Sequence, residues 1–244
     1  MSAGAFRHLL GEPPVELLVI APHPDDAEIG MGATIAKLTD QGRRVGVLEL
    51  TDGEPTPVGD PETRLAEATA AGRVLGLAWR ACLGLPNRSL TNDLEARWLI
   101  AAWIRRLRPT TVALPYWIDY HPDHTAAVPL IEAACFWARL SRCDLPGQPH
   151  RVRRLVYYYS IHLRQPVQPA FLVDVSQHIE RKLQALRCYR SQLDPAVRGP
   201  DVPVTPEELE TAARYWGWLA RCAHAEPFAV RTPLLIAHPE QFFC

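Results

Sequence analysis

Residues that can bind a metal ion are concentrated in two short segments of the sequence. The segment HPDD at 23–26 holds one imidazole and two carboxylates, and the segment HPDH at 121–124 holds two imidazoles and one carboxylate. Catalytic zinc sites use such side chains as three protein ligands and leave a fourth position open. We therefore predict that His23, Asp26 and His124 bind one metal ion.

The other residues of the two segments have the chemistry that hydrolysis requires. Asp25 lies beside the predicted ligands and is free to take a proton from water. His121 is placed either to stabilise an oxyanion or to protonate a leaving amine, and Asp123 to orient it. A metal, a base and an acid together describe the hydrolysis of an amide or an ester.

Each of these residues also has an ordinary structural explanation. Asp25 and Glu28 have the spacing of a D-x-x-E capping box, which would only begin a helix. His121, Asp123 and His124 would be unremarkable as polar loop residues. The prediction of a metal site depends on finding both loops in one chain, each directly after a predicted strand.

The elements that must bring the two segments together alternate along the first 140 residues. Predicted strands lie at 15–21, 44–51, 81–85 and 110–116, and predicted helices follow at 27–38, 61–75, 92–107 and 125–140. This alternation is typical of an α/β, Rossmann-like open sheet, mostly parallel, with helices on both faces. Right-handed crossovers place the carboxyl ends of parallel strands at one edge. His23 and His124, which follow the first and fourth strands, should therefore meet there.

The C-terminal part, about 150–244, has a less regular pattern. We predict strands at 151–160, 170–175 and 230–236, and helices at 176–193 and 205–223. The Pro-rich segment 193–206 between the two helices predicts a long loop and a candidate lid. No linker divides the sequence, so we expect one domain over 1–244 with its α/β core at about 15–140.

Composition excludes several functional classes. The 244 residues are 48% hydrophobic and 22% charged, with a formal net charge of −1, which argues against nucleic acid or a membrane as the main partner. No apolar run approaches the ~20 residues of a membrane span, and no signal peptide is visible. The six cysteines form no CxxC pair, which favours reduced thiols. We expect a cytoplasmic protein with a small-molecule partner. Whether it forms a homo-oligomer is left open by the sequence.

The motifs HPDDAEIG and HPDH, in this order, resemble those of the LmbE-like (PIG-L-type) zinc de-N-acetylases. That family removes acetyl groups from N-acetylglucosaminyl (GlcNAc) conjugates. The resemblance implies a zinc ion, or another divalent metal such as Fe²⁺, on the ligands predicted above, with Asp25 as the general base. It also implies that His121 and Asp123 form a pair that assists at the transition state.

Further motifs resemble the bacillithiol branch of the family, which deacetylates GlcNAc-malate: TRLAEA at 63–68, LPNRSL at 85–90, CYRSQ at 188–192 and AEPF at 225–228. This resemblance makes Arg64 and Arg88 candidates for binding the malate carboxylate. The branch has a mobile tyrosine in the segment matching 203–211, where this sequence has Glu208. GlcNAc-malate is the expected substrate, and another GlcNAc conjugate or a chitooligosaccharide is the alternative.

Two functions from other classes use the same residues differently. The pattern His23-x-Asp25 with His124 also fits the two-His-one-carboxylate site of non-haem iron oxygenases. We expect those enzymes on β-rich barrels, so the strand–helix alternation argues against this function. A non-catalytic sugar-binding protein is the other alternative, and it predicts that Asp25→Ala leaves function unchanged.

Overall fold

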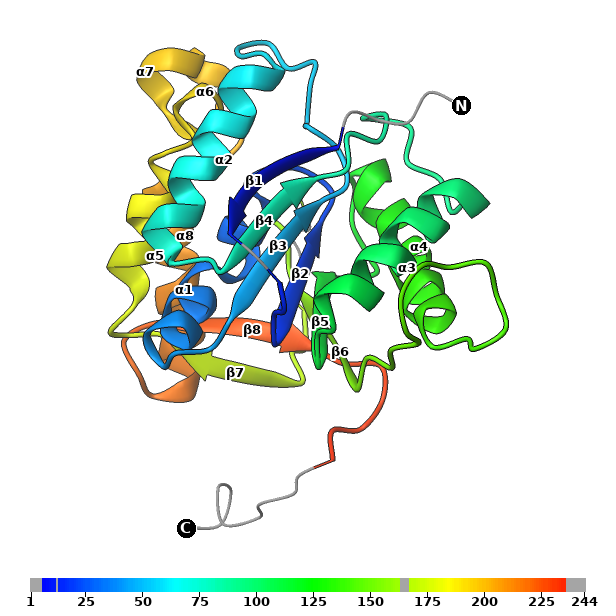
Figure 1. The fold of residues 1–244 in the computed structure, drawn as a ribbon. Coiled ribbons are helices and arrows are strands. Elements are labelled where there is room, and N and C mark those ends of the chain that lie inside the picture. The colour runs from blue at the N-terminus through cyan, green and yellow to red at the C-terminus, as the bar shows by residue number, and fades with distance from the viewer. Residues whose placement is uncertain (1–5, 12, 163–166, 236–244) are drawn as a thin grey trace.

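The computed structural model describes residues 6–11, 13–162 and 167–235. Its strands are β1 (Arg7–Gly11), β2 (Leu17–Ala21), β3 (Val45–Glu49), β4 (Trp79–Cys82), β5 (Thr111–Pro115), β6 (Arg154–Tyr158), β7 (Phe171–Asp174) and β8 (Ala225–Ala229). They form one eight-stranded sheet in the order β1-β4-β3-β2-β5-β6-β8-β7 (Figure 1). The five strands from β4 to β6 in this order run parallel. The predicted α/β fold with a mostly parallel sheet is therefore confirmed.

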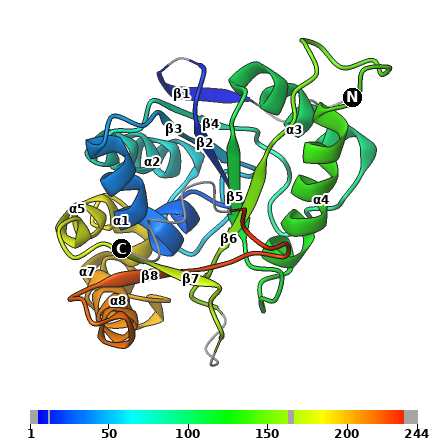
Figure 2. The same cartoon turned by 90° about the horizontal axis from the view of Figure 1, so that it is seen from below.

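Helices cover both faces of the sheet. They are α1 (Asp26–Asp40), α2 (Pro61–Leu75), α3 (Leu94–Leu107), α4 (Pro122–Ala138), α5 (Ile179–Leu186), α6 (Arg190–Leu193), α7 (Pro195–Arg198) and α8 (Pro206–Ala220), with a 3₁₀ turn at Gly199–Asp201. Figure 2 shows α3 and α4 on one side of the sheet and α1, α2, α5 and α8 on the other. Two apolar cores result, one between the sheet and each helical layer.

Local sequence signals explain where the well-predicted elements begin and end. All five residues of β2 are apolar and buried, as expected of a central strand covered on both faces. Asp60 caps α2 by accepting hydrogen bonds from two backbone N–H groups, and Gly76 ends it with a positive φ of 72°. Asp93 caps α3 by accepting a hydrogen bond from the Ala96 N–H, and Arg108 ends that helix directly before Pro109.

The sheet order creates a crevice at the carboxyl ends of β2 and β5. The chain adds β3 and β4 on one side of β2 and then returns to add β5 on its other side, with Val19 opposite Ala113. The loops that follow β2 and β5 therefore leave the sheet side by side. In open α/β sheets, ligands bind at such a switch point. The two predicted metal-binding segments occupy these two loops.

Several predicted elements differ from the structure. The antiparallel edge strand β1 was not predicted, and the strand predicted at 81–85 begins earlier, at Trp79. The predicted helix 176–193 is interrupted between α5 and α6, and the predicted loop 193–206 contains α7 and a 3₁₀ turn. The predicted terminal strand at 230–236 is wrong: the strand is β8, and 230–235 form none. The strand lies earlier in the chain because residues 225–229 pair with both β6 and β7.

The described cysteines are free thiols, in agreement with the prediction: Cys82, Cys135, Cys143, Cys188 and Cys222. Cys244 lies outside the described residues. Among the described helices, none combines the length and the apolar character needed to cross a membrane.

Candidate metal centre and active site

The loop between β2 and α1 has an unusual backbone at Asp25. This residue has a φ of 108°, a conformation that residues other than glycine rarely adopt, and its side chain accepts no capping hydrogen bond from α1. Glu28 does not complete a capping box either, because its buried carboxylate lies 2.6 Å from the Arg80 guanidinium. The capping-box interpretation is therefore wrong, and the Asp25 carboxylate is left to line a cavity.

The three predicted metal ligands converge. Oδ2 of Asp26 lies 3.1 Å from Nδ1 of His23 and 3.2 Å from Nε2 of His124. Two ligand atoms on a tetrahedral zinc with bonds of 2.0–2.2 Å lie roughly 3.3 Å apart. The Asp26 oxygen therefore lies from a nitrogen of each imidazole at about the spacing of two ligands on one ion.

A carboxylate holds the far nitrogen of each imidazole. Asp119 Oδ2 lies 3.0 Å from Nδ1 of His124, and Asp123 Oδ2 lies 3.2 Å from Nε2 of His23. Carboxylates in this position fix the ring and its tautomer in metal sites. The other nitrogen of His124, Nε2, is buried and lies 3.2 Å from Asp26 Oδ2, although no contact within the described residues gives it hydrogen-bond geometry. A buried imidazole nitrogen that faces a carboxylate oxygen in this way supports the conclusion that the residues fit a metal ion.

Asp123 has a different partner from the expected one. The sequence predicted that it orients His121, but its carboxylate contacts the His23 ring and accepts hydrogen bonds from the backbone N–H groups of Arg88 and Leu90, at 2.6 and 3.1 Å. Asp123 and His121 interact only through the Asp123 backbone N–H. Asp123 therefore joins the loop after β2 to the segment 88–90.

His121 begins α4 as its capping residue. Its Nδ1 accepts a hydrogen bond of 3.2 Å from the Asp123 N–H, so a neutral ring carries its hydrogen on Nε2. Burial, with the neighbouring His23 and His124 rings, lowers the pKa of His121 to about 4. Nitrogens of these three rings all lie within 4.8 Å of one another. At neutral pH, His121 is thus an uncharged hydrogen-bond donor beside the predicted metal ligands.

Asp25 is poised to change its protonation state near neutral pH. Burial raises its pKa to about 7, and the Arg64 guanidinium, whose Nη2 lies 3.3 Å from Oδ2, opposes this increase. Arg64 also donates a hydrogen bond of 2.5 Å to the Pro24 carbonyl, and only 3% of its surface is exposed. A general base is most effective when its pKa lies near the working pH.

Two of the predicted metal ligands, Asp26 and His124, form a charged pair. Burial alone would raise the pKa of Asp26, but the His124 and His23 rings hold it well below its usual value. Burial alone would lower the pKa of His124, but Asp26 and Asp119 raise it to about 10. A metal ion that binds His124 Nε2 would therefore have to displace a proton from this ring.

Sequence reasoning missed two residues of this cluster, Asp119 and His162. Asp119 lies two residues before His121, where an acidic residue in a loop is common, so only its contact with His124 reveals it. His162 follows β6 and belongs to no motif; its ring lies 4.9 Å from that of His124, and its Nδ1 lies 3.5 Å from Asp119 Oδ1. Parallel pairing of β6 with β5 brings it to the site.

A cavity of about 210 Å³ opens beside the metal ligands. Both predicted substrate-binding residues line it, although Arg64 is already bonded to Pro24 and Asp25, and Arg88 donates a hydrogen bond to the Pro55 carbonyl. The segment 193–206, predicted as a lid, contributes lining residues that include Arg198 and Pro203. It therefore forms one wall of the cavity.

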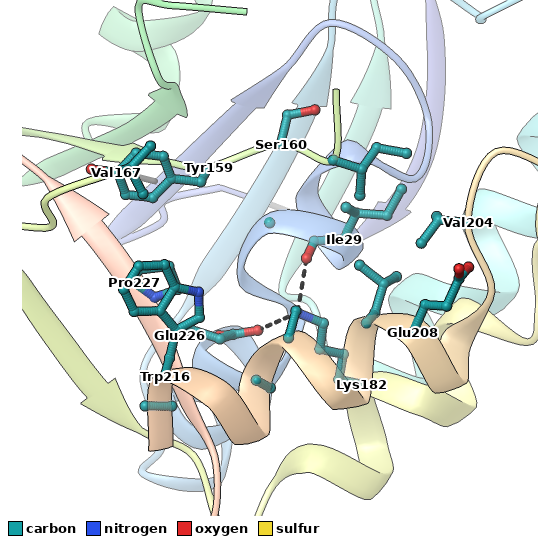
Figure 3. Close-up of a pocket in the computed structure, with 16 residues that line it drawn as sticks. Ile29, Tyr159, Ser160, Val167, Lys182, Val204, Glu208, Trp216, Glu226 and Pro227 are labelled. Atoms are coloured by element: carbon teal, nitrogen blue, oxygen red, sulfur yellow. Dashed lines mark hydrogen bonds and ion pairs between the residues drawn. The ribbon is translucent and has the colours of Figure 1, made fainter. Parts of the chain in front are cut away.

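A buried ion pair holds the part of α1 that carries Asp26. The helix is interrupted at Met31, whose φ and ψ are −152° and 25°. Glu226 accepts hydrogen bonds from the backbone N–H groups of Ala33 and Thr34 on the far side of this break, at 3.1 and 2.7 Å. Lys182 lies 2.6 Å from Glu226 and donates to the Ile29 carbonyl on the near side (Figure 3). The pair thus satisfies backbone groups that the break leaves unpaired.

Comparison with known proteins gives consistent matches. Residues 18–135 match the family described as PIG-L, GlcNAc-PI de-N-acetylase. Diacetylchitobiose deacetylase of Thermococcus kodakarensis is 36% identical over 226 residues, which cover 86% of this chain and 81% of that protein. A 1D-myo-inositol 2-acetamido-2-deoxy-alpha-D-glucopyranoside deacetylase of Nocardiopsis dassonvillei is 30% identical over 87% of this chain and 84% of its own length.

Solved structures agree with the sequence matches. The conserved protein TT1542 of Thermus thermophilus superposes with a TM-score of 0.83 at 41% identity, over 91% of this chain and 97% of that one. N,N'-diacetylchitobiose deacetylase of Pyrococcus horikoshii superposes with a TM-score of 0.73 at 26% identity, over 93% and 85% of the two chains.

Proposed function

The chain belongs to the PIG-L (LmbE-like) family of de-N-acetylases, and from that membership we propose that it hydrolyses the N-acetyl group of a short N-acetylglucosamine oligosaccharide of the diacetylchitobiose type. The observation that carries the proposal is the convergence of His23, Asp26 and His124 beside the uncommitted carboxylate of Asp25. The relative at 36% identity, which is named for diacetylchitobiose, favours this substrate over GlcNAc-malate.

His23, Asp26 and His124 would hold the metal ion, and we propose zinc because two imidazoles and a carboxylate are a common ligand set of catalytic zinc. When bound, the ion supplies Lewis acidity toward water and toward the acetyl carbonyl. Asp119 and Asp123 keep the two imidazoles in the orientation and tautomer that binding requires.

Asp25 moves the proton. As a carboxylate, it accepts a proton from the water that attacks the acetyl carbon. As a carboxylic acid with a pKa of about 7, it returns this proton to the amine nitrogen when the C–N bond breaks. The products are the free amine and acetic acid, which keeps the second proton of the water and gives it up to solvent as it ionises to acetate. Arg64 keeps the carboxyl group in place and its pKa from rising further.

His121 stabilises the developing charge on the carbonyl oxygen. Because its Nδ1 accepts the Asp123 N–H, the neutral ring presents its Nε2–H as a donor. A pKa of about 4 keeps the ring uncharged at neutral pH. Of the two roles predicted for His121, we therefore propose hydrogen bonding to the oxyanion.

GlcNAc-malate is a second candidate substrate, which one feature of the cavity favours. Arg88 and Arg198 line it, and guanidinium groups are suited to binding a carboxylate. Both side chains also have partners in the protein, the Pro55 carbonyl and Gln192 respectively.

The test is a panel of GlcNAc, diacetylchitobiose and GlcNAc-malate, followed by detection of the free amine and of acetate. We expect amine and acetate in equal amounts, with diacetylchitobiose giving the highest kcat/KM. Oxygen uptake without acetate would support the iron oxygenase instead. Release of amine from none of the three would contradict the proposal.

A further inference from the structure

A second cavity, of about 290 Å³, adjoins the catalytic one. It lies between α1, α8, β8 and the segment after β6, and Ile29 and Ile161 line both cavities. Figure 3 shows Trp216 and Glu208 along α8 on one side and Tyr159 and Ser160 on the other. We propose that this cavity binds the sugar ring next to the one that loses its acetyl group. The inference rests on the function proposed above.

The size of the two cavities favours a ligand that spans both. Pockets for small molecules usually enclose roughly 300–1,000 Å³. The catalytic cavity, about 210 Å³, and the adjoining one, about 290 Å³, each lie below this range, whereas together they lie within it. A disaccharide needs two adjoining spaces of this kind, and a single N-acetylglucosamine needs only the first.

The lining has the chemistry of a sugar site. Trp216 and Tyr159 offer aromatic surface for the apolar C–H face of a pyranose ring. Ser160 and Glu208 offer oxygen atoms for its hydroxyl groups. A pyranose ring has apolar C–H faces and hydroxyl groups around its edge, so this combination of aromatic and polar side chains suits it.

The charges in this cavity favour an uncharged ring over malate. Lys182 and Glu226 are both almost fully buried and lie 2.6 Å apart, so their charges neutralise each other. Glu208, which also lines this cavity, adds a negative charge that would repel a carboxylate. Its Oε2 already accepts the Thr205 N–H, which holds the side chain at the start of α8. A neutral, hydroxyl-rich sugar ring therefore fits best.

The experiment replaces the aromatic wall and compares two substrates. In Trp216→Leu we expect KM for diacetylchitobiose to rise about three- to tenfold with kcat unchanged. The kcat/KM for the monosaccharide GlcNAc should stay the same, because that substrate does not reach the second cavity. Trp216→Phe, which keeps an aromatic ring, should retain most of the affinity.

Trp218→Leu is the matched control, because Trp218 lies on the same helix but is 75% exposed and does not line the cavity. It should leave both substrates unaffected. Binding of diacetylchitobiose to Asp25→Asn, measured by titration calorimetry with and without Trp216→Leu, checks affinity without turnover. Thermal denaturation of each variant confirms that it is folded.

Equal losses on both substrates, or no change on either, would overturn the inference. If the wild-type enzyme deacetylates GlcNAc or GlcNAc-malate but neither binds nor deacetylates diacetylchitobiose, the second sugar site is wrong and the deacetylase function stands. If no GlcNAc compound is deacetylated, the proposed function itself fails.

Discussion

The carboxylate of Asp123 lies 3.2 Å from Nε2 of His23, although 100 positions separate the two residues in the sequence. A matching contact of 3.0 Å joins Asp119 to Nδ1 of His124. Each of the two imidazoles that contact Asp26 is thus held at its other nitrogen by a carboxylate. Asp119, in the loop after β5, holds His124, and Asp123, in the first turn of α4, holds His23. The predicted metal site is thus an arrangement of two imidazole–carboxylate pairs around the carboxylate of Asp26.

Removing either supporting carboxylate should weaken metal binding without abolishing it. We expect Asp119→Asn and Asp123→Asn each to lower zinc affinity about 10- to 100-fold, because the imidazole loses its fixed orientation and tautomer. Competition with a chromophoric chelator measures this affinity. His124→Ala should lose the metal altogether, whereas His121→Ala should keep it. Tight zinc binding by His124→Ala would contradict the ligand set.

Replacing Asp25 should separate catalysis from metal binding. In Asp25→Asn we expect kcat to fall about 10²- to 10⁴-fold, because the group that transfers the proton is gone. The zinc content, measured by mass spectrometry of the purified protein, should stay at the wild-type level. A variant that keeps full activity would show that another group is the base and would favour the non-catalytic alternatives.

The pH dependence of activity should report the pKa of Asp25. Because the carboxylate is the active form and its pKa is about 7, kcat/KM should rise with pH through about this value. A bound metal ion, through its positive charge, would lower the pKa of Asp25 and move this rise to lower pH. Arg64 lowers this pKa, so Arg64→Gln should raise it. The acid limb would then move to higher pH, with activity lost at pH 7 and partly recovered at pH 8. A limb that stays in place would show that Asp25 does not control it.

Zinc binding should release protons at neutral pH. The pKa of His124 is about 10 in the metal-free protein, so its imidazole carries a proton that the ion must displace. Titration calorimetry in buffers of different ionisation enthalpy counts the protons released. We expect at least one per zinc at pH 7.5, and zinc affinity that falls as the pH is lowered. Binding with no proton release would rule out His124 as a ligand.

Removing Glu226 should destabilise the protein and disturb the first turn of α1. Glu226→Ala leaves the buried ammonium of Lys182 without its partner, which costs about 3–5 kcal/mol of unfolding free energy. Chemical denaturation measures this cost. Glu16→Ala is the matched control, because the Glu16–Arg43 pair is exposed and should contribute less than about 1 kcal/mol. A cost for Glu226→Ala no greater than that of the control would contradict this role of the pair.

The sequence predicted the α/β core because its signals there are local. Buried apolar runs, caps such as Asp60 and stops such as Gly76 act within a few residues, so β2, β3, α2 and α3 were predicted almost at their observed bounds. The same reasoning failed for β1, at one edge of the sheet, and for β8, which lies between β6 and β7. Pairing with strands far away in the chain stabilises both of them.

The site divides in the same way. The motifs HPDD and HPDH predict His23, Asp26 and His124 as metal ligands. Closely spaced imidazoles and carboxylates after two strands of one sheet are seldom needed for folding alone. The sequence does not reveal Asp119 and His162 as neighbours of His124, or Asp123 as the partner of His23, because these contacts depend on how β2, β5 and β6 align. The sequence alone therefore determined which side chains are available for chemistry. The tertiary structure decided which carboxylate contacts which imidazole, because only packing sets the distances between residues far apart in the sequence.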